Sequence, residues 1–294
     1  MKKTVVVLFL FAAVIVSAVS GVDIYIDYLD GYLEVMDGGE WYELAIGDII
    51  ADTDTVRLDE NSVAELSLTG TKLTLTRPGV YVVADLLQAT GQRRSLGIAS
   101  VIGSKIRTIV EEPKQAQTAV MGVRGSKSED KLEWMTGDTA ELIETGKKYL
   151  AEGAYADAAE VFEEAYDFAD SSEESEALFY VGFTNAMLGD IRRAVEALDF
   201  VNPDPTTDFF VDLVLLKGQL LTETFAYEEA IEWLETHSPQ IKDSSATQLS
   251  LLLTGISHQG LGNTLLAKQS LEKVLAINPQ NEAGQAAQSL ISEL

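Results

Sequence analysis

Cysteine is absent from this sequence, and histidine occurs only twice, at His237 and His258. Without thiols the chain forms no disulfide bond and holds no metal through thiolate ligands. The two histidines are far apart in the chain, so they do not form the pair on one helical turn that many metal sites use. We therefore expect no metal site and no bound cofactor.

Positive charge is also scarce. The chain has 21 lysines and arginines against 47 aspartates and glutamates, which gives a formal net charge of -26. A surface this acidic repels the phosphates of DNA and RNA. The composition therefore argues against nucleic acid as a partner.

The sequence also lacks any combination of side chains that indicates catalysis. Asp52 and Asp54 resemble the start of a calcium-binding loop, but Val56 and Arg57 stand where that pattern needs an oxygen ligand and a glycine. A nucleophile, a base and an orienting acid cannot be assigned without forcing the pattern. We predict that the protein is not an enzyme and assign no catalytic residue.

Residues 1–20 have the organisation of an export signal. Two lysines precede an apolar run at Val5–Val16, which is too short for a comfortable membrane span. Ala18 and Ser20 are small residues at positions -3 and -1 of a cleavage site. We predict an exported protein of the periplasm or cell envelope that keeps no stable membrane span after cleavage. An uncleaved anchor helix is the alternative.

Residues 21–137 change character, because apolar residues alternate with polar ones, as they do at Val63–Leu68 and Leu73–Thr76. Short alternating runs separated by turns rich in glycine and aspartate indicate an antiparallel all-β domain. Four isoleucines then follow a helical period near residues 96–110. The sequence therefore predicts a β domain with a helical insertion.

Several short runs in this region share the pattern of one known family. They are Trp41–Leu44, Gly47–Asp48, Asp54–Arg57, Ser62–Leu66 and the later signature of Gly122, Val123, Arg124 and Gly125. With these runs the region resembles a FecR-like domain, a family first described in iron-dicitrate signalling. The resemblance implies an extracytoplasmic β domain that holds a ligand or an envelope component. A purely structural role of the signature, with its arginine paired to a carboxylate, is the alternative.

Residues 138–281 repeat themselves with a period of 36 or 37 residues. Each repeat has a glycine, an alanine twelve residues later and a large apolar residue after four more. The matched positions are Gly146, Gly182, Gly218 and Gly255; Ala158, Ala194, Ala230 and Ala267; and Phe162, Leu198, Leu234 and Leu271. The small residues let two helices of a hairpin approach closely. Units of this length bury their apolar faces by stacking on one another.

The repeats resemble tetratricopeptide repeats. The first unit matches the family pattern at Gly146, Tyr149, Gly153, Tyr155, Ala158, Phe162 and Ala165. In the third unit, Phe225 replaces the second glycine of the pattern. The resemblance implies a C-terminal all-α solenoid of four helix hairpins, closed by a capping helix at residues 282–294. The expected fold is thus multidomain, with a FecR-like β domain before the solenoid.

The first helices of such repeats line a concave groove, and this resemblance gives the candidate binding residues. They are Phe179, Phe183, Met187, Gln219, Glu223, Ile256 and Gln259. The first three form an apolar strip at helical spacing, suited to a protein or peptide partner. Burial of the strip between repeats is the alternative.

The expected function is a non-catalytic exported scaffold, with the β domain as a second module that binds a ligand or the envelope. Alternatives are a component of an extracytoplasmic signalling or envelope-assembly system, and a periplasmic enzyme or metal carrier.

Overall fold

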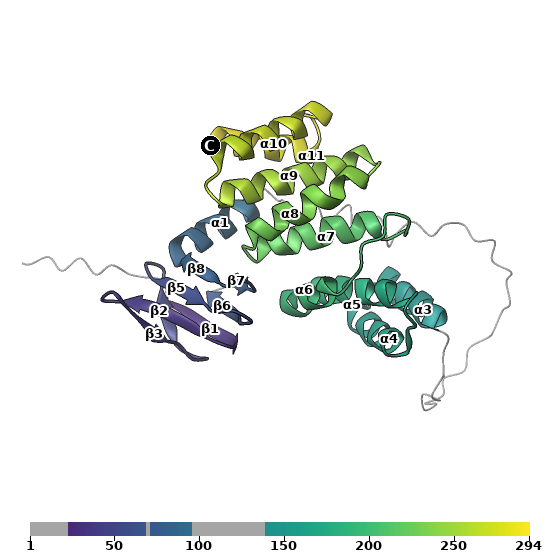
Figure 1. Ribbon diagram of the computed structural model, residues 1–294, viewed down its shortest axis with the longest axis horizontal. Helices are drawn as coiled ribbons and strands as arrows, with labels where there is room; N and C mark the ends of the chain where they lie inside the picture. The colour runs from purple at the N-terminus through teal and green to yellow at the C-terminus, as the bar shows by residue number, and fades with distance from the viewer. Residues whose placement is uncertain (1–22, 69–70, 96–138) are drawn as a thin grey trace, which may run out of the picture.

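The computed structural model describes residues 23–68, 71–95 and 139–294 (Figure 1). The export signal at 1–20, the helical insertion near 96–110 and the Gly122–Gly125 signature lie outside the described residues. Within the described ranges, none of the helices is both long enough and apolar enough to cross a bilayer.

The N-terminal part, here called the β unit, consists of two four-stranded antiparallel sheets. Their strand orders are β4-β1-β6-β7 and β3-β2-β5-β8. The strands are β1 (Asp23–Asp30), β2 (Leu33–Asp37), β3 (Glu40–Glu43), β4 (Ile49–Ala51), β5 (Thr55–Leu58), β6 (Val63–Leu68), β7 (Thr71–Leu75) and β8 (Gly79–Val82).

Alternation of apolar and polar residues explains these strands. Ile24 and Ile26 on β1 are buried, while Asp23, Tyr25 and Asp27 between and beside them are exposed. Successive side chains of a strand point to opposite faces, so one face of each sheet can join the core. The core of the β unit is built in this way from both sheets.

The prediction of an all-β FecR-like domain is wrong for the part that the structure describes. Strand β8 runs directly into α1 (Val83–Ser95), a helix of 13 residues. Val83, Leu86 and Leu87 follow the spacing of a helix face and pack with the β core. No helix was predicted at these residues, and the helix expected near 96–110 lies outside the described residues. The unit is a pair of small sheets with a helix, and the described chain is mostly helical.

The C-terminal part, here called the repeat array, is a stack of four helix hairpins and a last helix (Figure 1). The hairpins are α3 (Thr139–Ala151) with α4 (Tyr155–Phe168), α5 (Glu174–Leu188) with α6 (Ile191–Asp199), α7 (Phe210–Glu223) with α8 (Tyr227–His237), and α9 (Ser244–Gly260) with α10 (Thr264–Ile277). A short turn, η1 (Ser238–Gln240), follows α8, and α11 (Glu282–Glu293) packs on α10 and α9.

The repeated glycines lie where the two helices of each hairpin touch. A Cβ atom added at Gly146 would lie 2.6 Å from the Phe162 ring, and one added at Gly182 would lie 2.5 Å from Leu198 Cδ2. The glycines of the other two hairpins face Leu234 and Leu271 in the same way. The fixed offset of sixteen residues from glycine to large apolar residue therefore records a contact inside the hairpin.

Replacing Gly146 with alanine is expected to destabilise the first hairpin. The ring of Phe162 is rigid and fully buried, so overpacking should cost about 1–3 kcal/mol. The matched control is Gly91→Ala in α1, because a Cβ at Gly91 meets no atom within 4 Å. Alanine there should stabilise the helix by about 0.5–1 kcal/mol. Thermal melts of both variants test this, and a Gly146→Ala protein as stable as the parent would refute the contact.

Candidate functional site

One position distinguishes the third hairpin from the others. The turns of the first, second and fourth hairpins contain Gly153, Gly189 and Gly262, with φ between 72° and 81°. The third turn has Phe225 at the equivalent place, with φ of 63°. A side chain in this left-handed region costs about 1–2 kcal/mol, so its presence needs a compensating contact.

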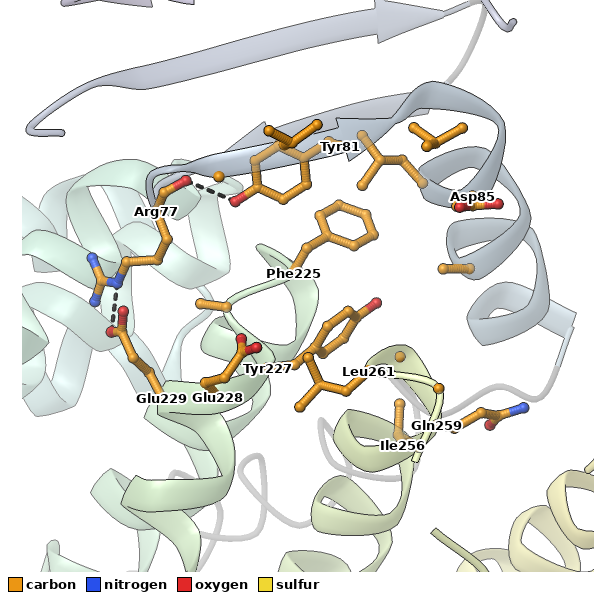
Figure 2. Close-up of a pocket in the computed structure, with 18 of the residues that line it drawn as sticks. Arg77, Tyr81, Asp85, Phe225, Tyr227, Glu228, Glu229, Ile256, Gln259 and Leu261 are labelled. Carbon is orange, nitrogen blue, oxygen red and sulfur yellow. Dashed lines mark hydrogen bonds and ion pairs between the residues drawn. The ribbon is translucent and has the colours of Figure 1, made fainter. Parts of the chain in front are cut away.

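The compensation comes from the β unit. Phe225 is only 6% exposed and belongs, together with Tyr227, to the hydrophobic core that contains Val83 and Leu86. Figure 2 shows the Phe225 ring between Tyr81 of β8 and Tyr227 of α8. The Phe225 and Tyr227 rings meet edge to face with 6.1 Å between centroids. The turn of the third repeat thus closes the core of the β unit.

Charged contacts hold the same junction together. Arg77, just before β8, bonds to Glu229 of α8 at 2.5 Å and to Asp199 of α6 at 3.2 Å. Asp199 also pairs with Lys217 of α7 at 2.9 Å. Burial lowers the pKa of Arg77, but the bond to Glu229 and the charge of Asp199 outweigh it, so the pKa is raised overall. The arginine remains charged and committed to these carboxylates.

A second contact joins β1 to the second hairpin. The Arg192 guanidinium of α6 lies 5.0 Å from the centre of the Tyr28 ring on β1. Together with the Arg77 pairs, this contact joins the β unit to the second and third hairpins.

A cavity of about 740 Å³ opens at this junction, and we call it the junction cleft (Figure 2). Strand β8 and helix α1 form one wall, and the start of α8 with the end of α9 forms the other. Asp85, Glu228 and Glu229 line it, whereas Arg77 is the one cation among its described lining residues. The cleft therefore combines an aromatic interior with an acidic rim.

Tyr81 is the polar aromatic side chain of the β8 wall. Its hydroxyl donates to the Arg77 carbonyl oxygen at 2.7 Å. Burial, and then the nearby negative charge of Glu228, raise the pKa of the Tyr81 phenol to about 12. The phenol therefore stays neutral at any physiological pH and holds the chain ahead of β8 in place.

Alkaline pH should loosen the junction. The pKa of Tyr81 is raised in the folded state, so its contribution to stability is complete below the usual phenol pKa of about 10 and is lost as the pH rises towards about 12. An absorbance titration should show one late-ionising tyrosine fewer in Tyr81→Phe than in the parent. Tyr180, raised to about 12 mainly by burial in the repeat array, is the internal reference that remains. Unchanged titration curves would contradict this assignment.

The apolar strip predicted as the groove surface lies in the core. Phe179 and Phe183 are 1% and 3% exposed, and Met187 is half-buried against the same cluster. Phe179 stacks on Phe209 with 5.0 Å between ring centroids. The strip is therefore buried between repeats, which is the alternative that the sequence left open. It is not a free surface for a partner.

The remaining predicted groove residues divide into two groups. Gln219 and Glu223 on α7 bond to each other, from Nε2 to Oε1, at 2.7 Å. Ile256 and Gln259 on α9 line the junction cleft (Figure 2). The structure thus places two predicted positions beside Tyr81, Phe225 and Tyr227, which sequence reasoning did not select. A phenylalanine at a glycine position was the available signal.

The two histidines are packing residues. His258 is buried, and burial lowers its pKa; burial also lowers the pKa of His237, whose ring lies 4.1 Å from Trp233 between centroids. In the part of the chain that the structure describes, no three histidine, aspartate or glutamate side chains are grouped to hold a metal ion.

Comparison with known proteins gives a fold-level likeness only. No family model and no curated protein matches the chain. Solved structures similar to it include residues 41 to the end of MamA from Desulfovibrio magneticus RS-1, which is 21% identical with a TM-score of 0.43. That match covers 53% of this chain and 93% of the other.

Two further solved structures are described as tetratricopeptide or TPR proteins. One, from Parabacteroides merdae, is 18% identical with a TM-score of 0.45. That match covers 53% of this chain and 59% of the other. The other, from Thermus thermophilus, is 20% identical with a TM-score of 0.35. That match covers 53% of this chain and 82% of the other. The repeat array of this chain is TPR-like, because it is a stack of helix hairpins in which a glycine packs on a large apolar residue.

Proposed function

We propose that this protein is a non-catalytic scaffold that binds a protein partner in the junction cleft. The observation that carries the proposal is the cleft itself, about 740 Å³ in volume and walled by two parts of the chain distant in sequence. Phe225 supports it, because a strained side chain is kept where the other turns have glycine. Residues with strained backbone conformations cluster at functional sites.

The partner we propose is a protein segment. The cleft has aromatic side chains inside and carboxylates at its rim, a mixture suited to peptide side chains. In this proposal the β unit forms one wall of the site and is not a separate module that binds a second ligand.

Site-specific photo-crosslinking tests the scaffold proposal. A photoreactive amino acid at Gln259, which lines the cleft, should give a covalent adduct with a protein in the envelope of the source organism. The control position is Lys268, exposed on α10 and outside the cleft lining. Adducts at Lys268 alone, or turnover by the purified protein, would count against the proposal.

We further propose that the protein is exported and processed before Gly21. The proposal rests on the lysines, the apolar run and the small residues of the first twenty positions. Mass spectrometry of protein from the source organism should find a mature N-terminus near Gly21. An intact Met1 on protein from the membrane fraction would contradict it.

A further inference from the structure

Strand β8 lies at the end of its sheet. The sheet order is β3-β2-β5-β8, so β8 pairs with β5 on one side, and no described strand pairs with its other side. An unpaired strand edge presents backbone donors and acceptors that can bind another extended chain.

The register shows which backbone groups face that open edge. The Val83 N–H donates to the Asp54 carbonyl at 3.0 Å, two residues beyond the Tyr81–Val56 pair. Hydrogen-bonded and non-bonded pairs alternate along an antiparallel ladder. Gly79 and Tyr81 therefore bond to β5, whereas the N–H and C=O groups of Val80 and the N–H of Val82 are directed away from it.

The junction cleft runs along this edge. Successive side chains of a strand point to opposite faces, and the cleft is lined both by Tyr81 and by its neighbours Val80 and Val82. A cavity that touches both faces of β8 must pass its edge. Val80 and Val82 are 60% and 42% exposed, so this side of the strand is open among the described residues.

Charge indicates what kind of chain fits. Asp85 and Glu228 are exposed at the rim, and Arg77 already pairs with Glu229 and Asp199. The chain as a whole carries a net charge of -26. Cationic side chains of an incoming segment would meet carboxylates here, and its apolar side chains would meet Tyr81 and Leu86.

We propose that an extended, lysine- or arginine-containing segment of a partner protein adds to the β unit as a strand beside β8. The proposal rests on the scaffold function above and assigns its site and the chemistry of its partner. Main-chain hydrogen bonds to Val80 give affinity, and alternate side chains give selectivity, as in strand addition generally. The acidic rim selects basic sequences.

The test uses a fluorescent peptide of alternating valine and lysine, six residues long and blocked at both ends. The comparison peptide has glutamate in place of lysine. Fluorescence anisotropy with the full chain should show at least ten-fold weaker binding of the glutamate peptide. Asp85→Asn with Glu228→Gln should weaken the lysine peptide, and rising salt should do the same.

Val80→Pro isolates the strand pairing. Proline removes the outward N–H of Val80 without taking a bond from β5, and edge strands tolerate it. It should weaken binding of the lysine peptide about ten-fold, the equivalent of about 1.4 kcal/mol, while Val80→Thr keeps the parent affinity. A natively melting Val80→Pro protein that binds like the parent would overturn the proposal.

Other occupants give other results. Dimerisation abolished by Val80→Pro would assign the edge to a second copy, and a parent protein that binds neither peptide would exclude this class of ligand. Both results would overturn the strand-addition proposal. Adducts at Gln259 that persist in Val80→Pro would still support the scaffold, so the two proposals can fail separately.

Discussion

Phe179→Ala is expected to lower the free energy of unfolding of the repeat array by about 3–5 kcal/mol. The side chain is 1% exposed, stacks on Phe209 and meets Tyr180 edge to face with 5.0 Å between centroids. Truncation leaves a cavity between the second and third hairpins, which the surrounding helices refill only in part. Chemical denaturation followed by circular dichroism measures the loss.

Phe200→Ala is the matched control for that measurement. Phe200 follows α6 in the same repeat and is 78% exposed. Its truncation removes little buried surface, so the change should stay within about 0.5 kcal/mol. Equal stability of the Phe179→Ala and Phe200→Ala proteins would show that Phe179 is not a core residue. Phe179 would then again be a candidate for binding a partner in the groove.

Phe225→Gly is expected to separate the β unit from the repeat array. The loss of the buried ring costs about 3–5 kcal/mol, and relief of the left-handed backbone returns about 1–2 kcal/mol. Loss of the ring destabilises the shared core, whereas relief of the backbone strain stabilises only the α7–α8 turn. The array should therefore keep its own stability while the β unit unfolds earlier.

Calorimetry and proteolysis measure this separation. The parent should melt in one main transition, and Phe225→Gly should show an earlier transition with faster cleavage within residues 23–95. Asn61→Gly is the control, because Asn61 is the other described residue with positive φ apart from glycine, at 54°, and is exposed. A single unshifted transition in Phe225→Gly would mean that the ring does not join the two parts.

The repeat array was accessible to sequence reasoning because its contacts are local and recur. Gly146 and Phe162 lie sixteen residues apart, as do their counterparts in every unit, and they touch inside one hairpin. The strands were accessible for a similar reason, since alternation such as that around Ile24 sets the buried face without reference to distant residues.

The junction was not accessible in the same way. Phe225 and Tyr81 are far apart in the chain, and no sequence pattern in either segment predicts that the two are in contact. Helix α1 was not predicted, because β8 passes into it without an intervening turn signal at Val83. The strip at Phe179 was ambiguous, because an apolar helix face looks the same whether another helix or a partner covers it.

Hydrogen exchange at the Val80 amide, followed by NMR, tests the central claim most directly. In the free protein this N–H is directed away from β5 and should exchange quickly, whereas the neighbouring Tyr81 N–H should be protected. Saturation with the valine–lysine peptide should slow exchange at Val80 at least ten-fold and leave Tyr81 nearly unchanged. A bound peptide that leaves Val80 exchanging at its free rate would contradict binding at the β8 edge.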